Sequence, residues 1–137
     1  MIQPLPVSIR FSVPGNPVGK QRAGRNLATG KTFTPKKTAR YQNDIAWAAT
    51  AALQRVDRTR WPATTPVYLD VWIYYANNNI KKPDPDNVVK ALQDALAGIL
   101  FVKRESGKAD DFRVWPRVQH VTEKDANPRV DCLVSYV

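Results

Sequence analysis

The residues best suited to chemistry lie in one segment, Lys81-Lys82-Pro83-Asp84-Pro85-Asp86-Asn87-Val88-Val89-Lys90. Pro83 and Pro85 stiffen the turn that carries Asp84 and Asp86, because each proline fixes its own φ and restricts the residue before it. Stiff carboxylates suit a hard cation such as Mg²⁺, which binds through few carboxylates together with water and substrate phosphate. Lys90 follows Asp86 by four residues and shares its helix face, where it could stabilise charge that develops on a phosphate.

Each of these residues also has a purely structural interpretation. Asp86 could be the N-cap of the helix that follows, since aspartate is favoured there. Asp86 and Lys90 could form an ordinary ion pair worth a few tenths of a kcal/mol. Asp84 and Asn87 could simply form the turn. These alternatives account for the residues one at a time and leave their combination unexplained.

A second acidic element, Asp110-Asp111, precedes a strand expected at 112–121. If this strand neighbours the one expected at 67–75, one of the two aspartates could join Asp84 and Asp86. Carboxylates gathered on a phosphate-binding surface repel the ligand unless a divalent cation lies between them and the phosphate. The acidic cluster therefore indicates metal-assisted chemistry on a phosphate.

The charge of the chain also indicates a polyanionic partner. The 137 residues carry 21 Lys and Arg against 12 Asp and Glu. Between Gly15 and Arg40 there are basic residues and no acid, interleaved with glycine and proline. This composition predicts a mobile basic loop over about 14–37, either a phosphate-binding arm or a solvated linker. The expected nucleic-acid contacts are Lys20, Arg22, Arg25, Lys31, Lys36, Lys37, Lys81 and Lys82.

Length and composition exclude several classes of protein. A chain of 137 residues is expected to form a single domain over 1–137. One cysteine cannot form an internal disulfide, and one cysteine with one histidine cannot build a zinc finger or a metal–histidine nuclease. The sequence lacks an apolar run long enough to span a membrane, and its first residues do not resemble a signal peptide. We therefore expect a soluble cytoplasmic protein.

Hydrophobic periodicity predicts the elements that position these residues. Period-two and helical patterns alternate along the chain, and Asn127-Pro128 marks a turn between the last two strands. The predicted elements are a strand at 7–13, a helix at 38–56, a strand at 67–75, a helix at 86–97, and strands at 112–121 and 129–137. This order, β-α-β-α-β-β, predicts an α+β fold in which two helices pack on one mixed sheet of about four strands.

The pattern Asp84-x-Asp86-Asn87-x-x-Lys90, followed by Asp94 and then Asp110-Asp111 before a strand, resembles the RusA family of Holliday-junction resolvases. The opening Val13-Pro14-Gly15-Asn16-Pro17 and the basic loop after it are also similar to that family, so the resemblance covers nearly the whole chain. It implies a homodimeric endonuclease, bacterial or encoded by a phage or prophage, that acts in DNA recombination and repair. The implied reaction is the Mg²⁺-dependent cleavage of four-way DNA junctions by paired symmetric nicks, with Mn²⁺ as a substitute.

Carried over by position, the resemblance implies metal-binding catalytic carboxylates at Asp84, Asp86 and Asp111, and a catalytic lysine at Lys90. The stretch 101–109 is longer than in the family, so Asp110 is the alternative to Asp111. The basic run before Asp84 is thinner than the family's.

Two further expectations concern the DNA and the dimer. An aromatic side chain, Tyr41, Phe33 or Phe101, could stack at the junction crossover, with core packing as the alternative. Dimerisation could use the aromatic residues Tyr68, Trp72 and Tyr74 of the central strand, although burial of both its faces under the helices is the simpler interpretation. Two other functions stay open: a non-catalytic basic nucleic-acid-binding module, or a Mg²⁺-dependent nuclease for other branched DNA.

Overall fold

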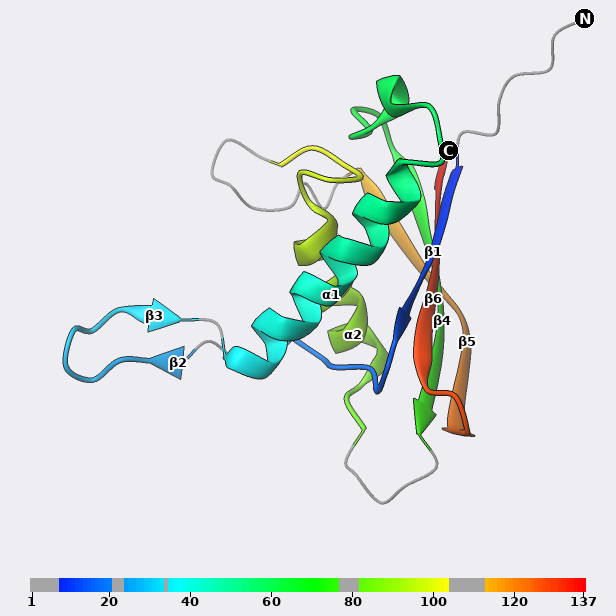
Figure 1. Ribbon diagram of the computed structural model, residues 1–137. Helices are drawn as coiled ribbons and strands as arrows, with labels where there is room; N and C mark the ends of the chain where they lie inside the picture. The colour runs from blue at the N-terminus through cyan, green and yellow to red at the C-terminus, as the bar shows by residue number, and fades with distance from the viewer. Residues whose placement is uncertain (1–7, 21–23, 34, 77–81, 104–112) are drawn as a thin grey trace, which may run out of the picture.

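Four strands form one mixed sheet, which is the framework of the computed structural model (Figure 1). The structure describes residues 8–20, 24–33, 35–76, 82–103 and 113–137. The strands of this sheet are β1 (Ser8–Pro14), β4 (Val67–Ala76), β5 (Val114–Asp125) and β6 (Arg129–Tyr136). Their order is β1-β6-β4-β5, with β4 and β5 parallel and the other neighbours antiparallel. The expected mixed sheet of four strands is confirmed.

Both long helices pack on the same face of the sheet (Figure 1). The helices are α1 (Lys36–Leu53), the short 3-10 helix η1 (Arg58–Arg60) and α2 (Pro85–Leu96). α2 begins at a proline, which fits the first turn because its missing N–H needs no partner there. It ends before Gly98, whose φ of +86° is a conformation that glycine adopts without strain. No helix of the described residues is long and apolar enough to cross a membrane.

The core lies between these helices and the sheet. Side chains alternate along β4, and Leu69, Val71 and Ile73 face the helices and are fully buried. Leu92 and Leu96 of α2 pack into the same cluster. Each large aliphatic side chain buried in this way contributes about 1.5–3 kcal/mol. The packing therefore fixes α2, and with it the residues of its first turn, against the sheet.

The opposite face of the sheet carries no helix in the described part of the chain (Figure 1). Tyr68, Trp72 and Tyr74 of β4 lie on this open face and are half-buried. The interpretation that the helices bury both faces of the central strand is therefore wrong. Two helices that pack side by side cover only one face of a four-stranded sheet.

Part of the basic segment is a hairpin where a loop was expected. Its strands are β2 (Gly24–Arg25) and β3 (Thr32–Phe33), which pair antiparallel and extend away from the sheet (Figure 1). Asn26 closes the turn, because its side chain accepts a hydrogen bond from the Ala28 N–H (2.9 Å) and its carbonyl accepts one from the Gly30 N–H (2.7 Å). The loop predicted over 14–37 is thus wrong at this hairpin and at its end, where α1 already begins at Lys36. Its mobility stays a prediction.

Candidate active site

The first turn of α2 presents the two predicted carboxylates. Asp84 is the N-cap residue in an extended conformation, and its backbone carbonyl accepts hydrogen bonds from the N–H groups of Asn87 (3.0 Å) and Val88 (3.2 Å). Its carboxylate makes no capping hydrogen bond. Asp86 is the second residue of α2, so the interpretation of Asp86 as the N-cap is wrong. The backbone carbonyl of Asp84 accepts these two hydrogen bonds, and its carboxylate is left for another partner.

Lys90 lies one turn further along the same side of α2. Asp84, Asp86 and Lys90 are all exposed. No ion pair joins Asp86 to Lys90, although their spacing would allow one, so the simple helix-pair interpretation finds no support among the described contacts. Two carboxylates and an ammonium group therefore lie within two turns of one helix and face solvent.

Tyr75 holds the turn that leads into these carboxylates. Its side chain is buried at the end of β4, and its hydroxyl donates a hydrogen bond to the carbonyl of Pro83. Burial raises the pKa of Tyr75 above its usual range, and the Asp84 and Asp86 carboxylates raise it further. The hydroxyl therefore stays protonated and able to donate at neutral pH. The sequence analysis missed this role, for which the only signal was a tyrosine at the last buried position of the strand before the motif.

A second support comes from the segment that enters the hairpin. The N–H of Lys20 donates a hydrogen bond to the carbonyl of Asn87 (2.9 Å). A Cβ on Gly19 would lie 2.8 Å from the Cβ of Pro83 and 3.0 Å from that of Asn87, so only glycine permits this close approach. The chain therefore runs directly across the first turn of α2.

The same contact brings the side chain of Lys20 to the site. Its Nζ lies 2.7 Å from an Oδ of Asp94, which follows Lys90 by four residues on α2. Both side chains are partly exposed, so the pair contributes less than about 1 kcal/mol. Lys20 and Lys90 thus line one side of the helix together. The sequence analysis predicted Lys20 as a phosphate contact but did not foresee its place beside α2.

Other predicted cations lie just before α2, at the start of α1 or on the hairpin. Lys36 and Lys37 occupy the first turn of α1, which contains no acidic residue. Cations are unfavourable at the positive end of a helix, by about 0.3–1 kcal/mol each, so the placement does not serve helix stability. The described basic residues predicted to contact nucleic acid are exposed or half-buried; they are Lys20, Arg25, Lys31, Lys36, Lys37 and Lys82.

Several predicted site residues fall outside the described part of the chain; they are Arg22, Lys81, Asp110 and Asp111. Among the described residues no three acidic, histidine or cysteine side chains gather to form a metal cluster. β5 does neighbour β4, as the convergence of the carboxylates requires. Their parallel register, however, places Val114 beside Val67, at the far end of β4 from Ala76. Strand adjacency alone therefore does not bring the start of β5 to the Asp84 turn.

The aromatic residues considered for stacking on DNA are mostly in the core. Tyr41 is 4% exposed and Phe101 is 1% exposed, so core packing, the alternative to stacking, is confirmed for both rings. Both have large apolar rings at positions that face the helix–sheet interface, which explains their burial. The side chain of Phe33 lies outside the described residues.

The family model described as endodeoxyribonuclease RusA matches residues 14–130. The matched range contains the Asp84–Lys90 motif, the Gly19–Lys20 segment and both helices. No curated protein matches the chain.

Proposed function

Since the chain belongs to the RusA endodeoxyribonuclease family, we propose that it is a Mg²⁺-dependent endonuclease that resolves four-way DNA junctions by paired symmetric nicks in recombination and repair. The observation that carries this proposal is the first turn of α2. There Asp84 and Asp86 are exposed and unused by helix capping, Lys90 lies one turn away, and Tyr75 holds the preceding turn in place. The proposed setting is the cytoplasm of a bacterium, with a gene of bacterial or phage origin.

The donor set fits a hard divalent cation. Asp84 and Asp86 offer carboxylate oxygens on a stiff turn and leave room for water and a phosphate oxygen, as Mg²⁺ requires. The family resemblance adds Asp111 as the third carboxylate, with Asp110 as the alternative; because β5 begins at the far end of β4 from the Asp84 turn, this third ligand rests on the resemblance alone. Mn²⁺ is expected to substitute. A Mg²⁺ ion bound by these residues would supply a Lewis acid that activates a water molecule and binds a phosphate oxygen.

The chain's own residues then perform the remaining tasks. The ammonium group of Lys90 neutralises negative charge on the phosphate as water attacks. Lys20 lies beside it, and its weak, partly exposed pair with Asp94 can be exchanged for a DNA phosphate. Arg25 and Lys31 on the hairpin, with Lys36 and Lys37 on α1, bind the backbone further from the scissile bond and fix the register of the DNA.

A homodimer is part of the proposal. A four-way junction has two-fold symmetry, and each chain carries one Asp84–Lys90 motif. Symmetric nicking of opposing strands therefore needs two copies related by a two-fold axis.

The two other functions make different predictions. A non-catalytic binding module would share the basic surface. It gives no reason for Asp84 and Asp86, two carboxylates that take no part in helix capping and that repel phosphate on such a surface. A nuclease for other branched DNA would use the same chemistry and differ only in which DNA it cuts. The choice between junction and other branches is therefore a matter of substrate shape.

The substitution Asp86→Asn tests the proposed chemistry. It removes one metal-binding charge and preserves size, so junction cleavage should fall by at least about 100-fold while binding persists. The control is Asp44→Asn, which changes an exposed carboxylate on α1 and should leave cleavage intact. A loss of junction affinity of more than about tenfold in Asp86→Asn would instead make Asp86 a structural residue.

A further inference from the structure

The turn of the β2–β3 hairpin carries an apolar side chain. Leu27 is 95% exposed, more than any other large apolar side chain that the structure describes. The turn that contains it lies at the end of the hairpin farthest from the sheet (Figure 1). Turns are usually made of glycine, proline, asparagine, aspartate and serine, so the turn itself gives no reason for a leucine. Single exposed leucines are common, and the surroundings of this one decide what it can do.

Polar groups of the turn hold its backbone without any contribution from Leu27. The side chain of Asn26 accepts hydrogen bonds from the N–H groups of Ala28 (2.9 Å) and Thr29 (3.3 Å). The N–H of Asn26 donates to the carbonyl of Lys31 (2.8 Å). All hairpin residues whose burial the structure describes are exposed, and Leu27 packs on no part of the core. The turn is therefore ordered by its own hydrogen bonds and holds an apolar side chain out into solvent.

The surroundings of Leu27 are cationic. Arg25 and Lys31 flank the turn, one on each side, and the segment 15–40 contains no acidic residue. No ion pair among the described residues engages either cation. Trp47 on α1 is also exposed, at 76%, but it follows the carboxylate of Asp44 by one turn. An apolar tip between two cations fits a nucleic acid whose phosphates lie beside uncovered base faces.

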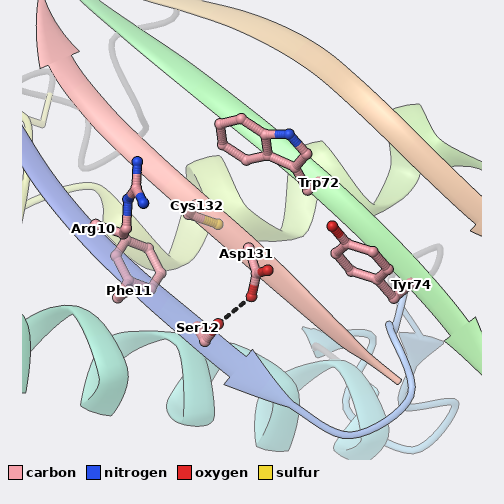
Figure 2. Close-up of a pocket in the computed structure, with 7 residues that line it drawn as sticks. All are labelled: Arg10, Phe11, Ser12, Trp72, Tyr74, Asp131 and Cys132. Atoms are coloured by element: carbon pink, nitrogen blue, oxygen red, sulfur yellow. Dashed lines mark hydrogen bonds between the residues drawn. The ribbon is translucent and has the colours of Figure 1, made fainter. Parts of the chain in front are cut away.

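The cations of the open sheet face, by contrast, already have carboxylate partners. Arg117 donates two hydrogen bonds to Asp70, at 2.7 and 2.8 Å, and Arg129 contacts Asp131 at 3.2 Å. Asp131 also accepts a hydrogen bond from the Ser12 hydroxyl at the edge of a shallow pocket on this face (Figure 2). A DNA phosphate would have to displace carboxylates here, whereas at the hairpin it meets cations that no described carboxylate engages.

The root of the hairpin is fixed to the candidate active site. The N–H of Lys20 donates to the carbonyl of Asn87 in the first turn of α2 (2.9 Å), and Gly19 lies directly against Pro83. Leu27 follows Lys20 by seven residues, so it lies at most about 25 Å from Lys20. This distance corresponds to about seven base pairs at 3.4 Å each. The hairpin tip can therefore contact bases close to a phosphate bound at the α2 site.

We propose that Leu27 is an apolar wedge that enters branched DNA between the base pairs at the branch point, while Arg25 and Lys31 bind the phosphates beside it. The inference rests on the proposed function and assigns recognition of the branch to the hairpin. In a continuous duplex, a wedge must first unstack a base step, which is costly. At a branch point the strands diverge, so the base pairs there have already lost a stacking neighbour. Leu27 therefore favours a four-way junction over a linear duplex and reads its shape, not its sequence.

Binding measured in EDTA tests this preference without cleavage. Fluorescence anisotropy compares a labelled immobile four-way junction with a matched linear duplex. Leu27→Ala should weaken junction binding by at least about fivefold, because it removes most of the apolar surface of the tip, and change duplex binding by less than about twofold. Leu27→Met keeps an apolar side chain of similar size and should retain the wild-type preference. The control Val137→Ala trims a side chain that is 58% exposed at the C-terminus and should bind both DNAs like the wild type.

A second measurement locates the wedge on the DNA. 2-Aminopurine at the branch point becomes more fluorescent when it loses stacking, so it reports the entry of a side chain. The wild type and Leu27→Met should raise this fluorescence, and Leu27→Ala should not. The same base placed within one arm of the junction should respond to none of the three proteins.

Each outcome supports or overturns the proposal. Equal losses on junction and duplex in Leu27→Ala, or no loss on either, overturn it. A wild type without preference for the junction also overturns it, as does branch-point fluorescence that Leu27→Ala still raises. Cleavage is measured in Mg²⁺ on the same preparations. Asp86-dependent nicking together with unchanged binding by Leu27→Ala would overturn the wedge but not the nuclease, and Leu27-dependent junction binding without any cleavage would do the reverse.

Discussion

At the scale of single residues, Asp84 divides its backbone and its side chain between two tasks. Its carbonyl accepts the first hydrogen bonds of α2, and its carboxylate makes no capping hydrogen bond. Pro85 next to it has no N–H to satisfy. This arrangement leaves a negative charge at the positive end of the helix, where it is stabilised yet exposed to a metal ion or solvent.

The hydroxyl of Tyr75 holds this turn through the carbonyl of Pro83. Tyr75→Phe removes the hydroxyl that donates to Pro83, which should cost about 0.5–1.5 kcal/mol of stability. Because the turn carries Asp84, we also expect cleavage to need several times more Mg²⁺ for half-maximal rate. A Mg²⁺ titration of the cleavage rate measures this shift.

Tyr136→Phe is the matched control for Tyr75→Phe. In the wild type, the Tyr136 hydroxyl also donates to a backbone carbonyl, that of Arg60 in η1. Tyr136 plays no part in the α2 site. This variant should lose a similar amount of stability and keep the wild-type Mg²⁺ midpoint. Equal Mg²⁺ midpoints in the two variants would reduce Tyr75 to a structural residue.

At the scale of elements, α2 is held from two directions. Its apolar side packs on the sheet, and the Gly19–Lys20 segment crosses its first turn. The sequence predicted the helix and its motif well, because Asp84, Asp86 and Lys90 lie within one short periodic segment. It did not predict the contacts of Gly19 or Tyr75, since these depend on tertiary packing between segments.

The direction in which β5 runs beside β4 also could not be predicted from the pattern of that strand alone. Its alternation predicts a strand, but the strand's own pattern does not state which way it runs beside β4. The order strand–helix–strand, which favours parallel neighbours, was the available signal. The predicted elements also implied the open face, because two helices are too few to cover both sides of four strands.

Asp70 of β4 and Arg117 of β5 form an acid-sensitive ion pair between the two strands. The hydrogen bond from Arg117 lowers the pKa of Asp70, with a further contribution from Gln119, so the carboxylate is more acidic in the folded state than in the unfolded chain. Its contribution to stability is present above the unfolded pKa of about 3.9 and is lost as the pH falls through the folded value.

Asp70→Asn should therefore lower stability near neutral pH by about 1–3 kcal/mol and flatten the loss of stability below about pH 4. Urea unfolding at several pH values measures both effects. Asp44→Asn, at an exposed site on α1, is the control. If the free energy of unfolding of Asp70→Asn falls below pH 4 as steeply as that of the wild type, this ion pair contributes nothing to acid unfolding.

At the scale of the whole molecule, the two sides of the sheet differ in their exposed residues. Exposed cations gather on the hairpin, at the start of α1 and beside α2, on the helix-covered side of the sheet. The open side carries rings and balanced charges. The net charge predicted a polyanionic partner from the sequence alone, but only the structure shows on which side of the sheet the hairpin, α1 and α2 carry their exposed cations.

The start of α1 tests this electrostatic surface. Replacing Lys36 and Lys37 with alanine should reduce the slope of log affinity against log salt by about 0.9 for each DNA phosphate that the protein no longer neutralises. Arg55→Ala with Arg58→Ala, beyond the other end of α1, removes the same charge and should leave the slope nearly unchanged. Equal slopes in both double variants would exclude the start of α1 from the DNA interface.

The central claim is that α2 presents a metal-dependent nuclease site for branched DNA. Incubation of the purified protein with a labelled immobile four-way junction and a matched linear duplex, with Mg²⁺ or with EDTA, tests it most directly. We predict paired, symmetric nicks in the junction alone and only with Mg²⁺, which Asp86→Asn abolishes. Binding to junctions of several sequences without any cleavage in Mg²⁺ or Mn²⁺ would contradict the claim and favour a binding module.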